Sequence, residues 1–152
     1  MNINIFPTFS PVYSDVIQKL CEIEHACFNE DEAFSDEMMP KLVNNSSIIV
    51  LAYDNTKLIG YGLARDAFGV GYLYSNAVLP AYRKQGIGTK ILDIRIYQLR
   101  KVRQCNLVQA HTRTNNRESA KLLFKFGFLP IKYEPDFYEE NSDAILWEKN
   151  LL

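Results

Sequence analysis

Residues 78–89 read Val-Leu-Pro-Ala-Tyr-Arg-Lys-Gln-Gly-Ile-Gly-Thr, between a β-rich run and a stretch with helical spacing. Gly86 and Gly88 carry no Cβ, so the backbone there can approach a ligand closely. The N–H groups at a helix start have no partner inside the helix, and the helix dipole favours an anion beside them. Arg83 and Lys84 add positive charge at the same place. The segment therefore predicts an anion-binding loop, although it matches neither of the phosphate motifs GxxxxGKS/T and GxGxxG.

The residues on either side of this loop predict a strand, a helix and a second strand. Residues 70–79 are β-rich and stop at Pro80, and residues 106–113 form another such run. Between them, residues 88–103 carry apolar side chains on one helical face, namely Ile91, Leu92, Ile96, Leu99 and Val102. A connection of this length joins two parallel strands by a right-handed crossover.

Capping residues and hydrophobic spacing define the other elements. Ser10 and Pro11 are expected to cap and open the first helix, and Ser35 to cap the second. Asn115 or Asn116 is expected to cap a helix that ends at Gly127. In chain order we expect a strand at 2–6, helices at 11–27 and 35–43, strands at 47–53, 58–65 and 70–79, a helix at 88–103, a strand at 106–113, a helix up to 127, and strands at 129–133 and 144–149. This order predicts one α/β (α+β) domain over residues 1–152, with a mostly antiparallel sheet around a central parallel β-α-β crossover.

The composition is that of a globular domain with an uneven distribution of charge. The 152 residues are 47% apolar and 23% charged, with a net charge of −1 and a pI near 6.1. Residues 61–130 carry twelve Lys or Arg against three Asp or Glu, whereas residues 1–60 carry three against nine. A cationic middle suggests a central anionic ligand, and acidic flanks suggest a cationic one. The modest pI argues against nucleic acid as a partner.

Three further features bear on location and metal content. The longest apolar run, at 48–53, is far shorter than the roughly 18 residues of a membrane helix, so we expect no membrane partner. Cys21, Cys27 and Cys105 form no CxxC pair and are expected to be reduced thiols of a cytoplasmic protein without a secretion signal. His25 has no partner at a metal-ligand spacing, so no metal site is expected.

The loop at 78–88 resembles the acetyl-CoA motif of the GNAT acetyltransferases, Arg/Gln-x-x-Gly-x-Gly/Ala. Residues 116–128, with Asn116, Ala120 and Gly127-Phe128, are similar to a second motif of that superfamily. The resemblance implies the GNAT fold and acetyl-CoA as co-substrate. It implies that the CoA pyrophosphate is held by Arg83, Lys84, Gln85, Gly86, Ile87, Gly88 and Thr89. It also implies that pantetheine pairs with Asn76, Ala77 and Val78 like an added strand, with Asn116 nearby.

His111 is the candidate base for removing a proton from an amine acceptor. Alternation along residues 106–113 places it on the polar face with Gln109 and Arg113. The ordinary pKa of a histidine side chain, about 6.5, suits a base that works near neutral pH. The alternative is an ordinary strand histidine without a role.

Within the GNAT superfamily, the chain most resembles the N-terminal (Nα) acetyltransferases of the bacterial ribosomal-protein and NatE types. The resemblance implies that Tyr72 and His111 act together through water, and that Tyr138 contacts the acceptor. Phe28 is a candidate for a pocket that takes an apolar side chain of the acceptor, with packing in the core as the alternative. Two positions depart from the family pattern. Leu123 stands where many GNATs have the tyrosine that protonates the CoA thiolate, and Phe137 stands where the Nα enzymes have the first of two tyrosines. Tyr72 or another tyrosine then replaces the missing acid, or the thiolate leaves unassisted.

These features predict direct transfer of an acetyl group from acetyl-CoA to a primary amine, with both substrates bound in a ternary complex. The favoured acceptor is the N-terminus of a peptide or protein, and the enzyme is expected to be a monomer or a homodimer. Acidic residues gather at 30–37 and at 134–143, where GNAT-like architecture has the acceptor groove. They favour an alternative acceptor, a small cationic amine such as a polyamine, an aminoglycoside or an amino acid. A second alternative is a CoA-binding module without catalysis, which Leu123 would permit.

Overall fold

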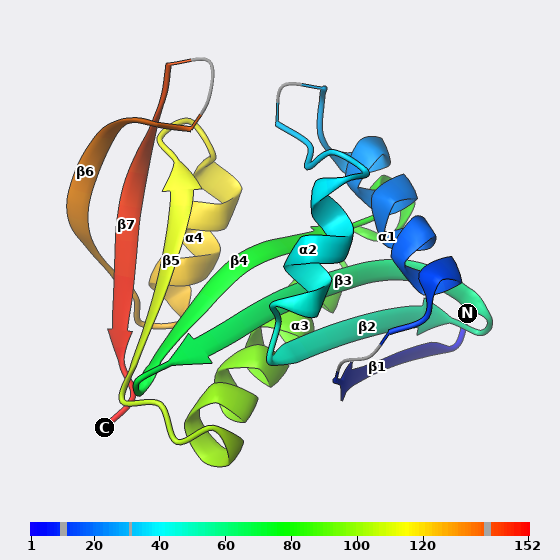
Figure 1. The fold of residues 1–152 in the computed structure, drawn as a ribbon, viewed down its shortest axis with the longest axis horizontal. Helices are drawn as coiled ribbons and strands as arrows, with labels where there is room; N and C mark the ends of the chain where they lie inside the picture. Colours follow the sequence, from blue (N-terminus) through cyan, green and yellow to red (C-terminus); the bar gives the residue numbers. More distant parts are fainter. Residues whose placement is uncertain (10–11, 31, 139–140) are drawn as a thin grey trace.

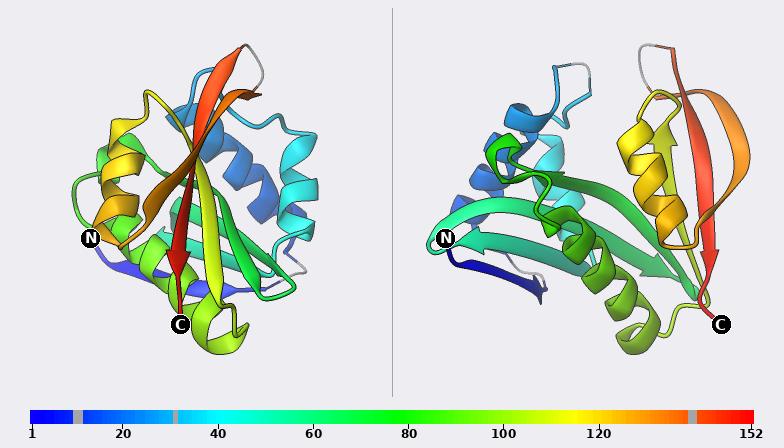
Figure 2. Two further views of the ribbon diagram at one scale, coloured as in Figure 1. Left: turned by 90° about the vertical axis from the view of Figure 1, so that its left-hand side faces the viewer. Right: turned by 180° about the vertical axis from the view of Figure 1, so that it is seen from behind.

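The computed structural model describes residues 1–9, 12–30, 32–138 and 141–152. They form one seven-stranded sheet in the order β1-β2-β3-β4-β5-β7-β6, with α1 and α2 on one face and α3 and α4 on the other (Figures 1 and 2). In chain order the elements are β1 (Ile3–Thr8), α1 (Ser14–Cys27), α2 (Met38–Asn44), β2 (Ile48–Asp54), β3 (Lys57–Ala67), β4 (Val70–Val78), α3 (Ile87–Tyr97), β5 (Leu107–Arg113), α4 (Arg117–Lys125), β6 (Leu129–Tyr138) and β7 (Ser142–Asn150). Short helical turns at Pro80–Tyr82 and Gln98–Val102 flank α3.

The predicted element order and fold class are confirmed, including the parallel pairing of β4 with β5. The first helix was expected from residue 11 but begins at Ser14, because Tyr13 is extended and its carbonyl accepts the first helical hydrogen bonds. Ser10 and Pro11 lie outside the described residues. The helix expected over 88–103 is α-helical from Ile87 to Tyr97. It continues as a π-helical turn to Val102.

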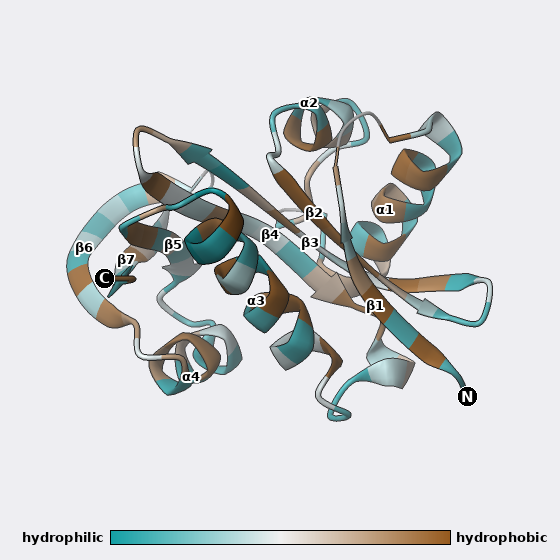
Figure 3. Ribbon diagram, turned by 90° about the horizontal axis from the view of Figure 1, so that it is seen from below, coloured by the Kyte–Doolittle hydropathy of each residue, from teal (hydrophilic) through white to brown (hydrophobic). Residues whose placement is uncertain are grey.

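Two hydrophobic clusters hold the sheet between its helices. One packs α3 and α4 on the sheet, with Ile91, Leu99 and Phe128 fully buried. The other packs α1 and α2 on the opposite face, around Leu20 and Met39. Figure 3 shows hydrophobic and hydrophilic residues in turn along α3, as expected for a helix with one face on the sheet. Among the described residues, no helix is both long and apolar enough to cross a membrane.

The sheet opens between β4 and β5. These two strands pair only from Val70 to Leu73, opposite residues 107–110. Tyr74 then stands at a bulge opposite β3, and beyond it β4 pairs with β3 alone. Figure 1 shows β4 and β5 diverging from a common end into a V. The backbone edge of β4 that faces β5 is therefore free of strand pairing at residues 76–78.

Gly62 of β3 faces α3 at close range. A Cβ built there would lie 2.5 Å from Ile91 Cγ2 and 2.8 Å from Arg95 Nε. We expect Gly62→Ala to lower the free energy of unfolding by about 1–3 kcal/mol, because both neighbours are packed in the core. Chemical denaturation measures this, with Gly88→Ala as control, since a Cβ at Gly88 would have its nearest neighbour, Val78 Cγ2, at 3.9 Å. Equal stability of Gly62→Ala and the wild type would show that Ile91 and Arg95 move aside freely.

Candidate active site

The V between β4 and β5 holds a cleft, and a second cavity adjoins it on the side of α2. The cleft has a volume of about 220 Å³ and lies against Ser75 and Asn76 of β4 and against α4. The second cavity, of about 300 Å³, is bordered by Leu42 of α2 and Arg65 of β3. The residues that line both are Phe34, Leu73, Tyr74, His111 and Tyr138. Two molecules bound in these spaces would therefore meet beside these shared residues.

The predicted anion-binding loop stands at the start of α3, after the end of β4. Gly86 adopts a left-handed conformation (φ 81°), and a Cβ on it would meet no atom within 4 Å. The N–H of Lys90 makes a helical hydrogen bond of 3.0 Å to the Gly86 carbonyl, so the N–H groups before it point out of the helix end. This open, glycine-lined cradle of N–H donors fits the pyrophosphate of CoA. Arg83 donates from Nε to the Val78 carbonyl (2.9 Å), which ties the loop to the end of β4.

The residues expected to flank pantetheine lie on both arms of the V. On one arm, Asn76, Ala77 and Val78 pair with β3 on one side only. On the other, Asn116 lines the cleft and caps α4, because its Oδ1 accepts a hydrogen bond of 3.1 Å from the Ser119 N–H. The free edge of β4 can thus pair with an extended group laid in the cleft.

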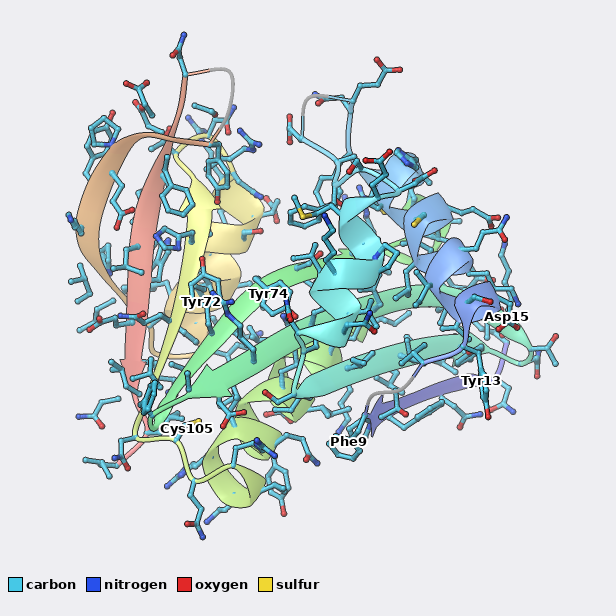
Figure 4. All side chains as sticks on the ribbon, viewed as in Figure 1. Phe9, Tyr13, Asp15, Tyr72, Tyr74 and Cys105 are labelled. Atoms are coloured by element: carbon cyan, nitrogen blue, oxygen red, sulfur yellow. The ribbon has the colours of Figure 1, made fainter. Side chains whose placement is uncertain are left out.

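Tyr72 and His111, which the family resemblance implies act together, lie in contact across the parallel strand pair. The Tyr72 hydroxyl is hydrogen-bonded to His111 Nδ1. Burial raises the pKa of Tyr72 to about 12, so its hydroxyl keeps its proton near neutral pH. The ring of Phe137 stacks on the imidazole with centroids 4.0 Å apart. Figure 4 shows Tyr72 and Tyr74 projecting from the same face of β4.

Glu134 on β6 is a site residue that the sequence did not single out. Its Oε2 lies 3.3 Å from His111 Nε2, so both ring nitrogens have partners. The acidic segment at 134–143 was the available signal. It indicated charge near an acceptor but not contact with His111, because β6 is irregular on both sides of Glu134.

Glu24 of α1 anchors the segment between α1 and α2 beside both cavities. Its carboxylate is almost completely buried and accepts hydrogen bonds from Tyr61 Oη (2.5 Å) and from the Phe34 N–H (2.9 Å). Burial raises the pKa of this carboxyl. Because Phe34 lines both cavities, Glu24 fixes part of their shared wall.

The second cavity is not lined, among the described residues, by the acidic side chains at 30–37 and 134–143 in the way that their position in the sequence suggested. Of the described residues that line it, none is acidic and one, Arg65, is a cation. The Arg65 guanidinium lies 5.5 Å from the ring centroid of Tyr72. The Asp143 carboxylate accepts hydrogen bonds from the Tyr133 hydroxyl and from the Asp136 N–H. Asp31, Glu139 and Glu140, which belong to the acidic segments, lie outside the described residues.

The remaining predicted site residues divide between cavity wall and core. Phe28 lines only the cleft, and Tyr138 lines both spaces, with Arg113 4.1 Å from its ring centroid. Leu123 is buried in the cleft wall and cannot donate a proton. In the described ranges, no three His, Cys, Asp or Glu side chains gather so as to hold a metal ion, and His25 instead bonds to Asp36 (2.7 Å).

The chain is similar to known acetyltransferases in sequence and in fold. The N-alpha-acetyltransferase of Sulfurisphaera tokodaii is 33% identical over 76 residues, which are 50% of this chain and 46% of that protein. The chain spans 45–60% of the length of four curated relatives and 70% of the length of a fifth. Ard1 from Thermoplasma volcanium shares the fold with a TM-score of 0.85 at 18% identity, over 99% of this chain and 98% of that one. Arabidopsis thaliana Naa50, in complex with the bisubstrate analogue CoA-Ac-MVNAL, does so with a TM-score of 0.78 at 22% identity, over 96% and 98%.

The family assignment rests on most of the chain. Residues 17–128 match the family described as Acetyltransferase (GNAT), and this range runs from α1 through the predicted anion-binding loop to the end of the turn after α4. The fold as a whole agrees with those of the solved structures. The chain therefore belongs to the GNAT family of acetyltransferases.

Proposed function

We propose that this protein transfers the acetyl group of acetyl-CoA to the α-amine at the N-terminus of a peptide or protein, with both substrates bound at once. The observation that carries the proposal is the position of His111, which lines both cavities and so stands where a thioester and an amine would meet. Membership of the GNAT family supports the donor. The name of the Sulfurisphaera relative and the peptide analogue bound to Naa50 support the acceptor.

The donor would be held by the loop and the cleft. Arg83 and the outward N–H groups of Ile87, Gly88 and Thr89 would bind the pyrophosphate, and residues 76–78 would pair with pantetheine. Acetyl-CoA supplies a thioester whose C–S bond breaks, with the electron pair leaving on sulfur, as the amine nitrogen bonds to the acetyl carbon. Tyr138 lines both spaces, and burial raises the pKa of its hydroxyl, so it stays protonated and is available as a hydrogen-bond donor there.

The acceptor nitrogen must lose a proton, and the hydrogen-bonded Tyr72–His111 pair would take it. An α-amine has an ordinary pKa near 7.7–8.0, whereas an amine of the lysine type has one near 10.4. A base of histidine strength therefore suffices for an α-amine but leaves most of a polyamine protonated. This difference favours the peptide N-terminus over a polyamine.

The residues that line the second cavity also favour a peptide N-terminus as the acceptor. It offers apolar surface from Phe34 and Leu42 and positive charge from Arg65, and its described lining holds no carboxylate. Such a space suits a first residue with an apolar or acidic side chain and repels a polycation.

This reading predicts a measurable order of acceptors. With peptides that differ only in the first residue, we expect kcat/KM to be higher for leucine or glutamate than for lysine. Arg65→Glu should lower kcat/KM for the glutamate peptide roughly five-fold relative to the leucine peptide, because an attractive exposed charge becomes repulsive. Arg103→Glu is the matched control, since Arg103 pairs with Asp66 (2.9 Å) and lines neither cavity. If spermidine or an aminoglycoside were acetylated and no peptide were, the acceptor would be a small amine and not a peptide.

A further inference from the structure

Three polar side chains from three strands form a continuous row at the junction of the two cavities. Tyr72 of β4 bonds to His111 Nδ1 of β5, and His111 Nε2 faces the Glu134 carboxylate of β6 at 3.3 Å. The histidine and glutamate side chains are only 12% and 22% exposed. The Phe137 ring covers one face of the imidazole. The row is thus fixed by packing as well as by hydrogen bonds.

The direction of each hydrogen bond follows from the Glu134 carboxylate. An ionised carboxylate only accepts hydrogen bonds, so His111 Nε2, which faces Glu134, must carry a proton. A neutral imidazole carries one N–H, so Nδ1 is then unprotonated and accepts the hydrogen bond from Tyr72, whose phenol keeps its proton at neutral pH. Glu134 therefore favours this tautomer over the other.

We propose that Glu134 is a positioning residue that holds His111 as the Nε2–H tautomer, so that Nδ1 takes the proton of the acceptor amine through the Tyr72 hydroxyl. The proposal rests on the proposed function. In the step, an N–H proton of the amine passes to Tyr72 Oη while the phenol proton passes to His111 Nδ1. The amine nitrogen loses one proton, Tyr72 ends as a neutral phenol, and His111 becomes an imidazolium beside the Glu134 carboxylate. The imidazolium later returns its Nδ1 proton to water.

Two cations lie on the rings around this row, and one anion contacts the imidazole. From β3, the Arg65 guanidinium lies over the Tyr72 ring, and from β5 itself Arg113 lies over the ring of Tyr138, which projects from β6. Of the three described residues in contact with the imidazole, Tyr72, Phe137 and Glu134, the glutamate is the one that can carry a negative charge. Glu134 is therefore placed to stabilise an imidazolium.

The tautomer can be read directly, without substrate. The chain has two histidines, so ¹⁵N-edited NMR spectra contain two imidazoles, and His25→Gln assigns them. We expect the His111 signals of the wild type, near pH 8, to show a protonated Nε2 and an unprotonated Nδ1. In Glu134→Ala we expect a mixture of the two tautomers. We also expect a fall in kcat of about 10-fold to 100-fold, the loss found when the partner that orients a metal-bound histidine is removed.

Glu148→Ala is the matched control. Glu148 is also a strand carboxylate, and it accepts a hydrogen bond of 2.7 Å from Gln109, on the same face of β5 as His111. This control should change neither the tautomer nor kcat, and Glu134→Asp should recover part of the lost rate. A proton on Nδ1 in the wild type, or an unchanged tautomer in Glu134→Ala, would overturn the proposal. A lack of turnover on any peptide would refute the proposed function but not the tautomer result.

Discussion

Replacing His111 with alanine is expected to lower kcat by about 100-fold to 10,000-fold, the usual contribution of a positioned general base. The side chain lines both cavities and bonds to Tyr72, so its loss removes the final proton acceptor and leaves the phenol without a partner. Acetyl-CoA binding should persist, because the anion-binding loop at the start of α3 is untouched. The measurements are the pH dependence of kcat and the shift in melting temperature caused by acetyl-CoA.

Two further variants separate this role from a general disturbance of the sheet. Tyr72→Phe keeps the ring that stacks on Tyr74 but removes the hydroxyl, and it should lower kcat with little change in the KM for acetyl-CoA. His25→Ala removes the exposed histidine that pairs with Asp36 and should leave kcat unchanged. If His111→Ala kept the wild-type pH–rate profile, His111 would have no part in the mechanism.

Gly88→Ala is expected to raise the KM for acetyl-CoA about 10-fold to 100-fold while leaving the fold intact. A Cβ at Gly88 would lie 3.9 Å from Val78 Cγ2, an ordinary contact, so the protein itself accommodates the methyl group. That methyl group would stand at the first turn of α3, among the N–H groups proposed to bind the pyrophosphate. Hydrogen bonds to charged groups contribute about 1.5–3 kcal/mol each, and the loss of one accounts for the expected change.

The test of Gly88→Ala combines kinetics with stability. The KM for acetyl-CoA should rise at a constant melting temperature of the free protein, and the KM for the peptide should stay near the wild-type value. An unchanged KM for acetyl-CoA would mean that the pyrophosphate does not lie against the start of α3. A loss of stability comparable to that of Gly62→Ala would mean that the methyl group disturbs packing instead.

The order of the elements could be predicted from the sequence because each element carries its own local signal. Asn116 caps α4 as its residue type suggests, and Gly127 ends that helix region with a left-handed backbone (φ 88°). Alternation along β5 gave the burial pattern, with Val108, Ala110 and Thr112 buried. The fold class and the parallel crossover followed from these local patterns combined with the handedness rule.

The site could be predicted only in part, since its geometry depends on contacts between distant strands. Alternation assigns His111 to a face of β5, but its contact with Tyr72 depends on the register of β4 on β5, which pairs Tyr72 with Gln109. The approach of Glu134 depends on irregular pairing of β6 with β7 on both sides of it. The bulge at Tyr74, where the pairing of β4 with β5 has ended, likewise has no clear local signal.

Acetyl transfer to a peptide whose α-amine is free, compared with the same peptide blocked at that amine, decides whether this protein is an Nα-acetyltransferase. Release of CoA thiol and the mass of the peptide fragments are followed together, for the wild type and for His111→Ala. We expect thiol release in equal amount to acetylated α-amine, none with the blocked peptide, and a severe loss in His111→Ala. If acetyl-CoA raised the melting temperature but were not consumed with any free peptide, the proposed function would be wrong.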